Sequence, residues 1–427
     1  MGAPQFSSNG RSGHRERGSG RYAHVVGWGV EVPQQVMTNF DLEKMVDTTD
    51  EWIRERTGIA ERRIADERDD IVSLGLKAAR KALNRADILP GDIDLIIVAT
   101  SSPNRLFPAA ACLIQDSLGA TRAGAFDLLA ACTGFIYGLD VASAHIKAGA
   151  ADTVLVIGTE TLSRILDWTD RRTCILFGDG AGAFVLKVKD IPGGIKNVVL
   201  HSDGSGADVL YANSSVKTHW NGHAPDQELR MNGRDVYRFA SRVMVSATEE
   251  VVDLAGITLD GIDVVVPHQA NLRIIQSAAR GLKMDMDKFI VNIDKYGNTS
   301  TASIPLALCE AVESGQIKPN DTVLLVAFGG GLTWGAALLE WQVEPTAGSQ
   351  LREAMREGLY ALAQVRSIIR RLWRALEALL FRPRYKRHKA TVTNAPAAIP
   401  APVEVEDDPS PPEVHEEHEE EERVLTN

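Results

Sequence analysis

Short apolar runs alternate with longer amphipathic stretches from Arg21 to about Val343. The runs have strand length and little polar alternation, which is typical of strands covered on both faces in a layered α/β protein. Five runs are predicted to be strands: Asp94–Thr100, Ala125–Ala130, Thr153–Ile157, Asp263–Val266 and Thr322–Ala327. The pattern therefore predicts a buried central sheet.

The two halves of this region repeat each other. Gly91–Ile97 resembles Gly261–Val266, and both segments lead into one of the apolar runs. Cys132 and Asn298 each begin a helical pattern that reaches a glycine 17 residues later, followed in each half by an Asp-Thr-Val-Leu run. We infer an ancient duplication that gives two similar α/β halves, with the active site between them.

Beyond Val343 the apolar residues recur every three or four positions, which predicts an amphipathic helix of roughly 30 residues. Residues 350–389 contain eleven Lys or Arg and three Glu, with Trp373 and Phe381 toward the basic end. Such a helix suits peripheral contact with an anionic membrane. Docking on the catalytic core, pairing with the same helix of another subunit, and neutralisation by the acidic tail remain alternatives.

Composition limits the class of protein. With 427 residues and 44% hydrophobic side chains, the chain can bury a large core. Its net charge of −11 lies in the tail, because Glu404–Glu422 hold eleven acidic and no basic residues. The sequence has no domain-wide excess of basic residues of the kind that would indicate nucleic-acid binding. Residues 1–20 lack the apolar run of a secretory signal, so we expect a cytoplasmic protein.

These features predict five segments along the chain. The middle three are an N-terminal half with the nucleophilic cysteine, a C-terminal half with the histidine and asparagine, and a basic amphipathic helix. Disordered segments are expected at both ends because of their polar, Pro-rich or charged composition. The predicted bounds are 1–20, 21–190, 191–343, 344–390 and 391–427.

Cys132 follows an apolar strand and opens a helical pattern, where unpaired N–H groups and the helix dipole favour a thiolate and lower the thiol pKa. A small buried side chain is the alternative interpretation of a free cysteine. The remaining cysteines, Cys112, Cys174 and Cys309, lie in apolar patterns and are predicted to be core residues. No C-x-x-C pair indicates zinc or redox chemistry.

His268 ends an apolar strand, where open sheets carry their sites, and Asn298 precedes a helical pattern. Taken singly, the histidine could be structural and the asparagine a helix cap. A cysteine, a histidine and an asparagine at three strand-to-helix junctions, two of them related by the repeat, instead favour one catalytic site. His219 and His223 are four residues apart, but their loop context does not favour a metal site.

Residues from about Arg21 to Trp341 resemble the β-ketoacyl-acyl-carrier-protein (ACP) synthase III family of thiolase-fold condensing enzymes. The resemblance rests on motifs that occur in the family's order and spacing. These are Ala131–Gly134 (Ala-Cys-Thr-Gly), Pro267–Asn271 (Pro-His-Gln-Ala-Asn), Tyr296–Ser300 (Tyr-Gly-Asn-Thr-Ser) and Phe328–Gly335 (Phe-Gly-Gly-Gly-Leu-Thr-Trp-Gly). The resemblance implies two α/β halves in α-β-α-β-α layers and a homodimer.

The resemblance also implies an acyltransferase that initiates fatty acid biosynthesis without a cofactor or metal ion. Cys132 would accept the acyl group of an acyl-CoA, and His268 with Asn298 would direct decarboxylative condensation with malonyl-ACP. Backbone N–H groups of Cys132 and Gly330 would form the oxyanion hole. A neutral Asn298 suits this role, because a carboxylate at the same place would repel the enolate.

Further residues are assigned by the same resemblance. Trp52 and Arg171 would sandwich the adenine of coenzyme A. Arg56, in the motif that follows Trp52, would also bind coenzyme A, and Asn271 would lie in the pantetheine tunnel. Phe107 would close the acyl pocket across the dimer interface, although packing alone also explains a phenylalanine. A basic patch could receive ACP, although exposed arginines are usually just solvated; its residues are Arg238, Arg273 and Arg280.

Two other functions are compatible with the sequence. One is a specialised relative that makes a polyketide, quinolone or ketone, or that transfers an acyl group to oxygen. The other is an inactive scaffold that recruits ACP to a membrane. The joint presence of Cys132, His268, Asn298 and the glycine turn argues against the scaffold. Acyl chain length and branching are not predicted.

Overall fold

The computed structural model describes residues 20–214, 226–343 and 350–380. The predicted disorder of residues 1–19 and 391–427 lies outside these ranges, and so do His219 and His223. The chain divides into two compact units between Arg374 and Ala375. All of the sheets and all of the predicted site residues therefore fall in the first unit.

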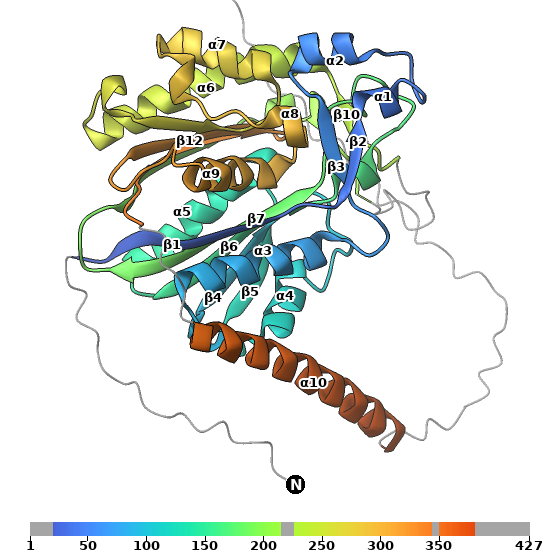
Figure 1. Cartoon of the computed structure of the whole chain (residues 1–427), viewed down its shortest axis with the longest axis vertical. Helices are drawn as coiled ribbons and strands as arrows, with labels where there is room; N and C mark the ends of the chain where they lie inside the picture. The colour runs from blue at the N-terminus through green and yellow to red at the C-terminus, as the bar shows by residue number, and fades with distance from the viewer. Residues whose placement is uncertain (1–19, 215–225, 344–349, 381–427) are drawn as a thin grey trace, which may run out of the picture. The chain divides into compact units, whose positions relative to one another are not determined.

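Two sheets form the centre of the first unit (Figure 1). One has the strand order β1-β7-β6-β4-β5 and the other β11-β12-β13-β8. Their bounds are β1 Tyr22–Glu31, β4 Leu95–Ala99, β5 Gly124–Leu128, β6 Thr153–Glu160, β7 Gly180–Lys189, β8 Gly194–Ser202, β11 Val264–Pro267, β12 Thr322–Gly329 and β13 Thr333–Glu340. All five predicted strand runs are confirmed.

The duplication appears in the pairing of the strands. In each sheet a parallel pair (β4 with β6, β11 with β12) is followed by an antiparallel pair (β6 with β7, β12 with β13), and then by an antiparallel edge strand, β1 or β8. The helices after Cys132 and Asn298 end near Gly149 and Gly315, whose φ angles are +76° and +75°. Glycine adopts this left-handed conformation without steric cost.

Helices form three layers around the two sheets (Figure 1). The central layer, α5 and α9, packs in an apolar cluster with residues of both sheets. A second cluster joins α6 and α7 to the outer face of the second sheet, and a third joins α3 and α4 to the first. Their bounds are α3 Ile71–Ala86, α4 Ala110–Leu118, α5 Gly134–Lys147, α6 Gly233–Ala255, α7 Leu272–Leu282 and α9 Ser303–Glu313. The predicted layered α/β fold is thus confirmed.

Shorter elements complete the described chain. Strands β2 and β3 pair with each other, as do β9 and β10. Their bounds and those of the remaining helices are β2 Gln35–Thr38, α1 Asn39–Leu42, α2 Asp50–Thr57, β3 Glu61–Ile64, β9 Leu210–Tyr211, β10 Arg230–Met231, α8 Ile293–Tyr296 and α10 Gln350–Leu380. The 3-10 turns Ala131–Thr133 and Ser300–Ala302 precede α5 and α9.

Two predictions about burial are wrong. Strand β5 is an edge strand with exposed or half-buried residues throughout, so it is not covered on both faces. Cys112 is exposed rather than part of the core, whereas Cys174 and Cys309 are buried. Both errors have one cause, which is that β5 lies at the edge of its sheet. Cys112 is on α4, which packs against β5, and its Sγ is 3.7 Å from the Ala125 carbonyl oxygen of that strand, so it shares the exposure of the edge.

Candidate active site

Cys132 is held in a strained turn at the start of α5. The preceding Ala131 has a φ angle of +45°, a left-handed conformation that is unfavourable for a residue with a Cβ atom. Gly329, at the end of β12, lies against this turn. A Cβ atom on Gly329 would stand only 2.7 Å from the Cys132 backbone nitrogen. The glycine turn of the second half therefore permits the close approach that seats the cysteine.

His268 continues the parallel ladder beyond the end of β11, because its N–H donates to the Val326 carbonyl oxygen of β12 at 2.8 Å. Its Nδ1 lies 2.6 Å from the Ser303 hydroxyl oxygen at the start of α9. The side chain is buried, and this burial lowers the imidazole pKa to about 3. His268 is therefore neutral at physiological pH, with Nε2 left for other contacts.

Asn298 is fixed by its backbone to the segment before β7. Its N–H donates to Leu176 at 2.8 Å, and its carbonyl oxygen accepts from the Gly178 N–H at 3.0 Å. The side-chain Oδ1 accepts from the Ser300 N–H at 2.9 Å. Since the amide oxygen has this partner, the Nδ2 group is the part of the side chain that can donate to a bound molecule.

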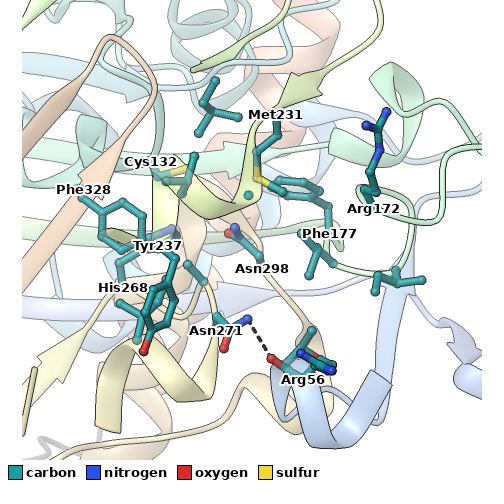
Figure 2. Close-up of a pocket in the computed structure, with 18 of the residues that line it drawn as sticks. Arg56, Cys132, Arg172, Phe177, Met231, Tyr237, His268, Asn271, Asn298 and Phe328 are labelled. Atoms are coloured by element: carbon teal, nitrogen blue, oxygen red, sulfur yellow. Dashed lines mark hydrogen bonds between the residues drawn. The ribbon is translucent and has the colours of Figure 1, made fainter. Parts of the chain in front are cut away.

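These three residues line one cavity of about 360 Å³. Figure 2 shows Cys132, His268 and Asn298 around its interior, together with Phe328 and Tyr237. The residues come from the 3-10 turn before α5, the end of β11 and the loop before α9, so both halves of the duplicated fold supply the site. The expectation that the site lies between the halves agrees with this geometry.

The thiol of Cys132 is less acidic than its position at a helix start suggests. Burial raises its pKa to about 12, and the nearby Glu160 carboxyl also raises it, while a hydrogen bond from Ser300 lowers it. The predicted lowering of the pKa is therefore wrong in this pocket. The physical reason is that loss of hydration disfavours the thiolate more than the first helical turn favours it.

A buried carboxyl, Glu160, ties the loops around the cysteine together. It accepts hydrogen bonds from the Ser102 hydroxyl at 2.6 Å, the Ser101 N–H at 3.0 Å and the Thr301 hydroxyl at 3.1 Å. Burial raises its pKa despite these donors. Thr301 belongs to the turn that follows Asn298, so Glu160 links the β4 and β6 strand ends to the asparagine loop.

Three of the residues assigned to coenzyme A also line the cavity: Trp52, Arg56 and Asn271. Figure 2 shows Arg56 and Asn271 on the side away from Cys132. The Asn271 Nδ2 donates to the Arg56 carbonyl oxygen at 3.1 Å (Figure 2), and its Oδ1 caps α7. Arg171 lies outside the cavity lining, but its guanidinium carbon is 5.4 Å from the centroid of the Trp52 ring. Arg172, which the sequence analysis did not assign, lines the cavity instead.

The other predicted residues lie around this cavity rather than in its lining. Gly330 directly follows the lining residue Gly329. Phe107 is 84% exposed and does not contribute to the cavity of its own chain. Arg238 of α6 and Arg273 of α7 are exposed and adjacent in sequence to the lining residues Tyr237 and Ile274, and Arg280 is exposed near the end of α7.

Some residues of the site escaped the sequence analysis. Ser303 and Glu160 contact the loops that carry the three central residues, and Met231, Phe177 and Tyr237 line the cavity. Ser303 belongs to the polar run that follows Asn298, and Glu160 ends an apolar strand; both positions are typical of site residues. Nothing local distinguishes the apolar lining residues. Within residues 20–214, 226–343 and 350–380, no cluster of His, Cys, Asp and Glu could hold a metal ion.

Comparison with known proteins identifies the family. Residues 126–204 match the family model described as 3-oxoacyl-[acyl-carrier-protein (ACP)] synthase III, and residues 252–341 match the model of its C-terminal part. The two matches contain Cys132, His268 and Asn298.

Full-length relatives extend the similarity over the whole catalytic region. The chain is 48% identical over 324 residues to β-ketoacyl-[acyl-carrier-protein] synthase III of Roseiflexus sp. (strain RS-1), covering 75% of this chain and 98% of that protein. The crystal structure of 3-oxoacyl-[acyl-carrier-protein] synthase III from Aquifex aeolicus VF5 has a TM-score of 0.71 and 47% identity, over 74% of this chain and 99% of that one.

A third relative is the synthase III from Thermus thermophilus, with a TM-score of 0.70 and 47% identity over 76% of this chain and all of that one. Identity at this level over nearly the full length of the relatives establishes the family and its activity, the condensation that initiates fatty acid synthesis. The chain belongs to the β-ketoacyl-ACP synthase III family of thiolase-fold condensing acyltransferases.

Proposed function

We propose that Cys132, His268 and Asn298 are the catalytic residues with which this chain condenses an acyl-CoA primer with malonyl-ACP. The observation that carries the proposal is their convergence on one cavity whose other end is lined by Trp52 and Arg56. A thiol at one end and cationic and aromatic side chains at the other suit a long thioester with a nucleotide at its end.

In the first half-reaction the Cys132 sulfur attacks the thioester carbonyl of acyl-CoA. The carbonyl oxygen becomes an oxyanion, which we assign to backbone N–H groups of Cys132 and Gly330. The C–S bond to coenzyme A then breaks, and the proton of the cysteine thiol leaves with the coenzyme A thiol. Burial raises the pKa of Cys132, so the free enzyme holds this residue as a thiol at neutral pH.

In the second half-reaction malonyl-ACP loses CO₂, and negative charge develops on its thioester oxygen. Neutral donors stabilise this enolate, and His268 and Asn298 are both suited to the task. The lowered pKa of His268 keeps the imidazole uncharged, and an O–H of Ser303 donated to Nδ1 would leave the proton on Nε2. The enolate carbon attacks the acyl-Cys132 carbonyl, and the sulfur leaves and takes up a proton.

The remaining assignments are parts of the same proposal. Trp52, Arg56, Arg171 and Asn271 bind coenzyme A, and Arg238, Arg273 and Arg280 receive ACP. Their exposure on α6 and α7, beside residues that line the cavity, supports an ACP position at its mouth. A homodimer is supported by the edge strand β5 and by the exposed Phe107, which we assign to the acyl pocket of the partner. We also propose a cytoplasmic location and peripheral membrane contact through residues 350–389.

The test is intact-mass analysis of the full chain after incubation with acetyl-CoA, longer acyl-CoAs and branched acyl-CoAs. We expect a single acyl adduct on the wild type and none on Cys132→Ala, with condensation reduced at least about 10³-fold in the variant. Adducts of equal yield on Cys132→Ala would refute the assigned nucleophile. Assays with malonyl-ACP and with malonyl-CoA then identify the acceptor.

A further inference from the structure

Helix α10 is attached to the catalytic unit by its polar face. Arg356 is fully buried, and its guanidinium donates to the Asn84 side-chain oxygen at 2.7 Å and to Asp87 at 2.8 Å, both at the end of α3. One turn later Tyr360 joins the apolar cluster of α3 and α4, and the Arg80 guanidinium lies 4.4 Å from its ring centroid. The basic side of the helix therefore provides its anchor.

The next two turns continue the attachment along α4. The Ser367 hydroxyl donates to the Asp116 carboxylate at 2.5 Å. Ala363 approaches the end of α4 so closely that a Cβ atom on Gly119 would lie 3.0 Å from its methyl group. Arg356, Tyr360, Ala363 and Ser367 are spaced by three or four residues, so they form one stripe of the helix.

The apolar stripe lies on the opposite side and is exposed. Leu362 and Leu372 are each 65% exposed, in contrast to 2% for Tyr360. An amphipathic helix of a globular protein normally turns its apolar face to the core. The exposed large apolar side chains of α10, as far as the end of the first unit at Arg374, are Met355, Leu359, Leu362, Val365, Ile368, Ile369, Leu372 and Trp373. A continuous patch of this kind on a monomer marks an interaction site.

This inference rests on the membrane contact proposed above for residues 350–389 and names its surface: we propose that the outward apolar face of α10 binds the surface of an anionic lipid bilayer and holds the synthase at a membrane. Three observations favour a bilayer over a second copy of the helix. The first is the width of the face: Leu359, Ile368 and Trp373 flank the central stripe, whereas a two-stranded coiled coil needs only a narrow seam with charged residues beside it.

The second observation is charge. Arg370, Arg371 and Arg374 are exposed on the polar side of α10, beyond the contact of the helix with α4 at Ser367, and the sequence continues into a basic segment with five Lys or Arg between residues 382 and 389. Arginines on the polar side of an interfacial amphipathic helix attract anionic headgroups. The third is Trp373, whose amphipathic ring suits the headgroup region.

The bound helix would lie in the interface and not cross it. Among the described residues, no helix is both long and apolar enough to span a membrane. Since the polar stripe of α10 is already occupied by α3 and α4, the helix can bury its apolar face in lipid without leaving the catalytic unit. The residues that line the cavity include none from α3, α4 or α10, so membrane binding and catalysis use separate surfaces.

The experiment is co-sedimentation of the full-length protein with vesicles of phosphatidylcholine alone and with vesicles that also contain phosphatidylglycerol. We expect binding to the anionic vesicles that weakens as salt is raised. The variant Leu362→Glu/Ile369→Glu should lose this binding. The matched control is Phe40→Glu/Leu254→Glu, which replaces two other exposed apolar side chains and should bind as the wild type does.

A second variant tests the charge. Arg370→Gln/Arg371→Gln/Arg374→Gln should reduce the affinity for anionic vesicles on the order of a hundredfold, since each surface arginine contributes a factor of about five. Acyl-enzyme formation in vesicle-free buffer, expected to be unchanged, verifies that each variant is folded. The proposal is overturned if wild type ignores anionic vesicles or if Leu362→Glu/Ile369→Glu still binds them. If wild type does not bind vesicles but sediments as a larger assembly that Leu362→Glu/Ile369→Glu no longer forms, the apolar face would instead contact a second copy of the chain.

Discussion

The catalytic cavity and helix α10 bury polar groups for different ends. In the cavity, His268 and Asn298 are buried; the His268 Nδ1 is hydrogen-bonded to the Ser303 hydroxyl, and the Asn298 Oδ1 accepts from the Ser300 N–H. On α10, Arg356 is buried to the same degree, but its partners Asn84 and Asp87 serve only to fasten the helix. Burial of a polar group therefore marks a site only when the group also faces open space.

The apolar residues of the two regions differ in the same way. Phe177, Val236 and Phe328 line the cavity with apolar surface, while the apolar stripe of α10 is exposed to solvent. Exposed apolar surface costs about 25 cal/mol for each Å² that could have been buried. In this chain the exposed apolar surface belongs to α10, which follows the last residue matched by the family models, Trp341. Its position points to a function separate from catalysis.

The largest effect should come from a charge at the enolate. Asn298→Asp keeps the shape of the side chain but replaces a neutral donor with a carboxylate, so condensation should fall on the order of 10³-fold. Asn298→Ala, the control, loses the donor without gaining a charge and should be less impaired. Acyl transfer to Cys132, followed by intact mass, should persist in both. An Asp variant at least as active in condensation as the Ala variant would contradict the proposed role.

A smaller effect is expected from Gly329→Ala. The added methyl group would stand 2.7 Å from the Cys132 nitrogen, so the turn that carries the thiol must shift. A displacement of this size should reduce both half-reactions by about 10²-fold. Gly91→Ala is the matched control, because a Cβ atom there meets no atom within 4 Å. Rates of acyl-adduct formation and of condensation, measured for both variants, test this contact; equal rates would exclude it.

The sequence predicted the cavity better than it predicted α10. Cys132, His268 and Asn298 could be grouped because each lies where a strand ends or a helix begins, and because the repeat relates two of them; the structure brings all three to one cavity. The spacing of α10 identified its two faces but not which one would dock. That choice depends on the partners Asn84, Asp87 and Asp116 on other helices, which no local pattern connects to it. The Cys132 pKa was missed for the same reason, since burial is a tertiary property.

Arg356→Met tests whether the polar face of α10 is its anchor. Methionine keeps much of the apolar stem but loses the bonds to Asn84 and Asp87, so local opening of the helix should become about tenfold more frequent. Hydrogen exchange of α10 amides is the measurement. Arg352→Met is the control: it also removes a contact with Asp87, at 3.0 Å, but from a side chain that is 54% exposed, so the change should be smaller. Unchanged exchange in Arg356→Met would mean that other contacts hold the helix.

The smallest effect concerns the neutral histidine of the cavity. The pKa of His268 is lowered by burial from 6.5 to about 3, so below pH 6.5 the unfolded chain takes up a proton that the native protein does not. Stability from this group is fully present above pH 6.5 and is lost as the pH falls toward about 3, by about 1 kcal/mol per pH unit. His268→Gln removes this dependence. Urea unfolding of both proteins at pH 7.5 and pH 5.5 should therefore show a wild-type loss about 1 kcal/mol greater than that of the variant. Equal losses would mean that His268 titrates normally in the folded protein, and the neutral donor assigned to the enolate would then need a different source.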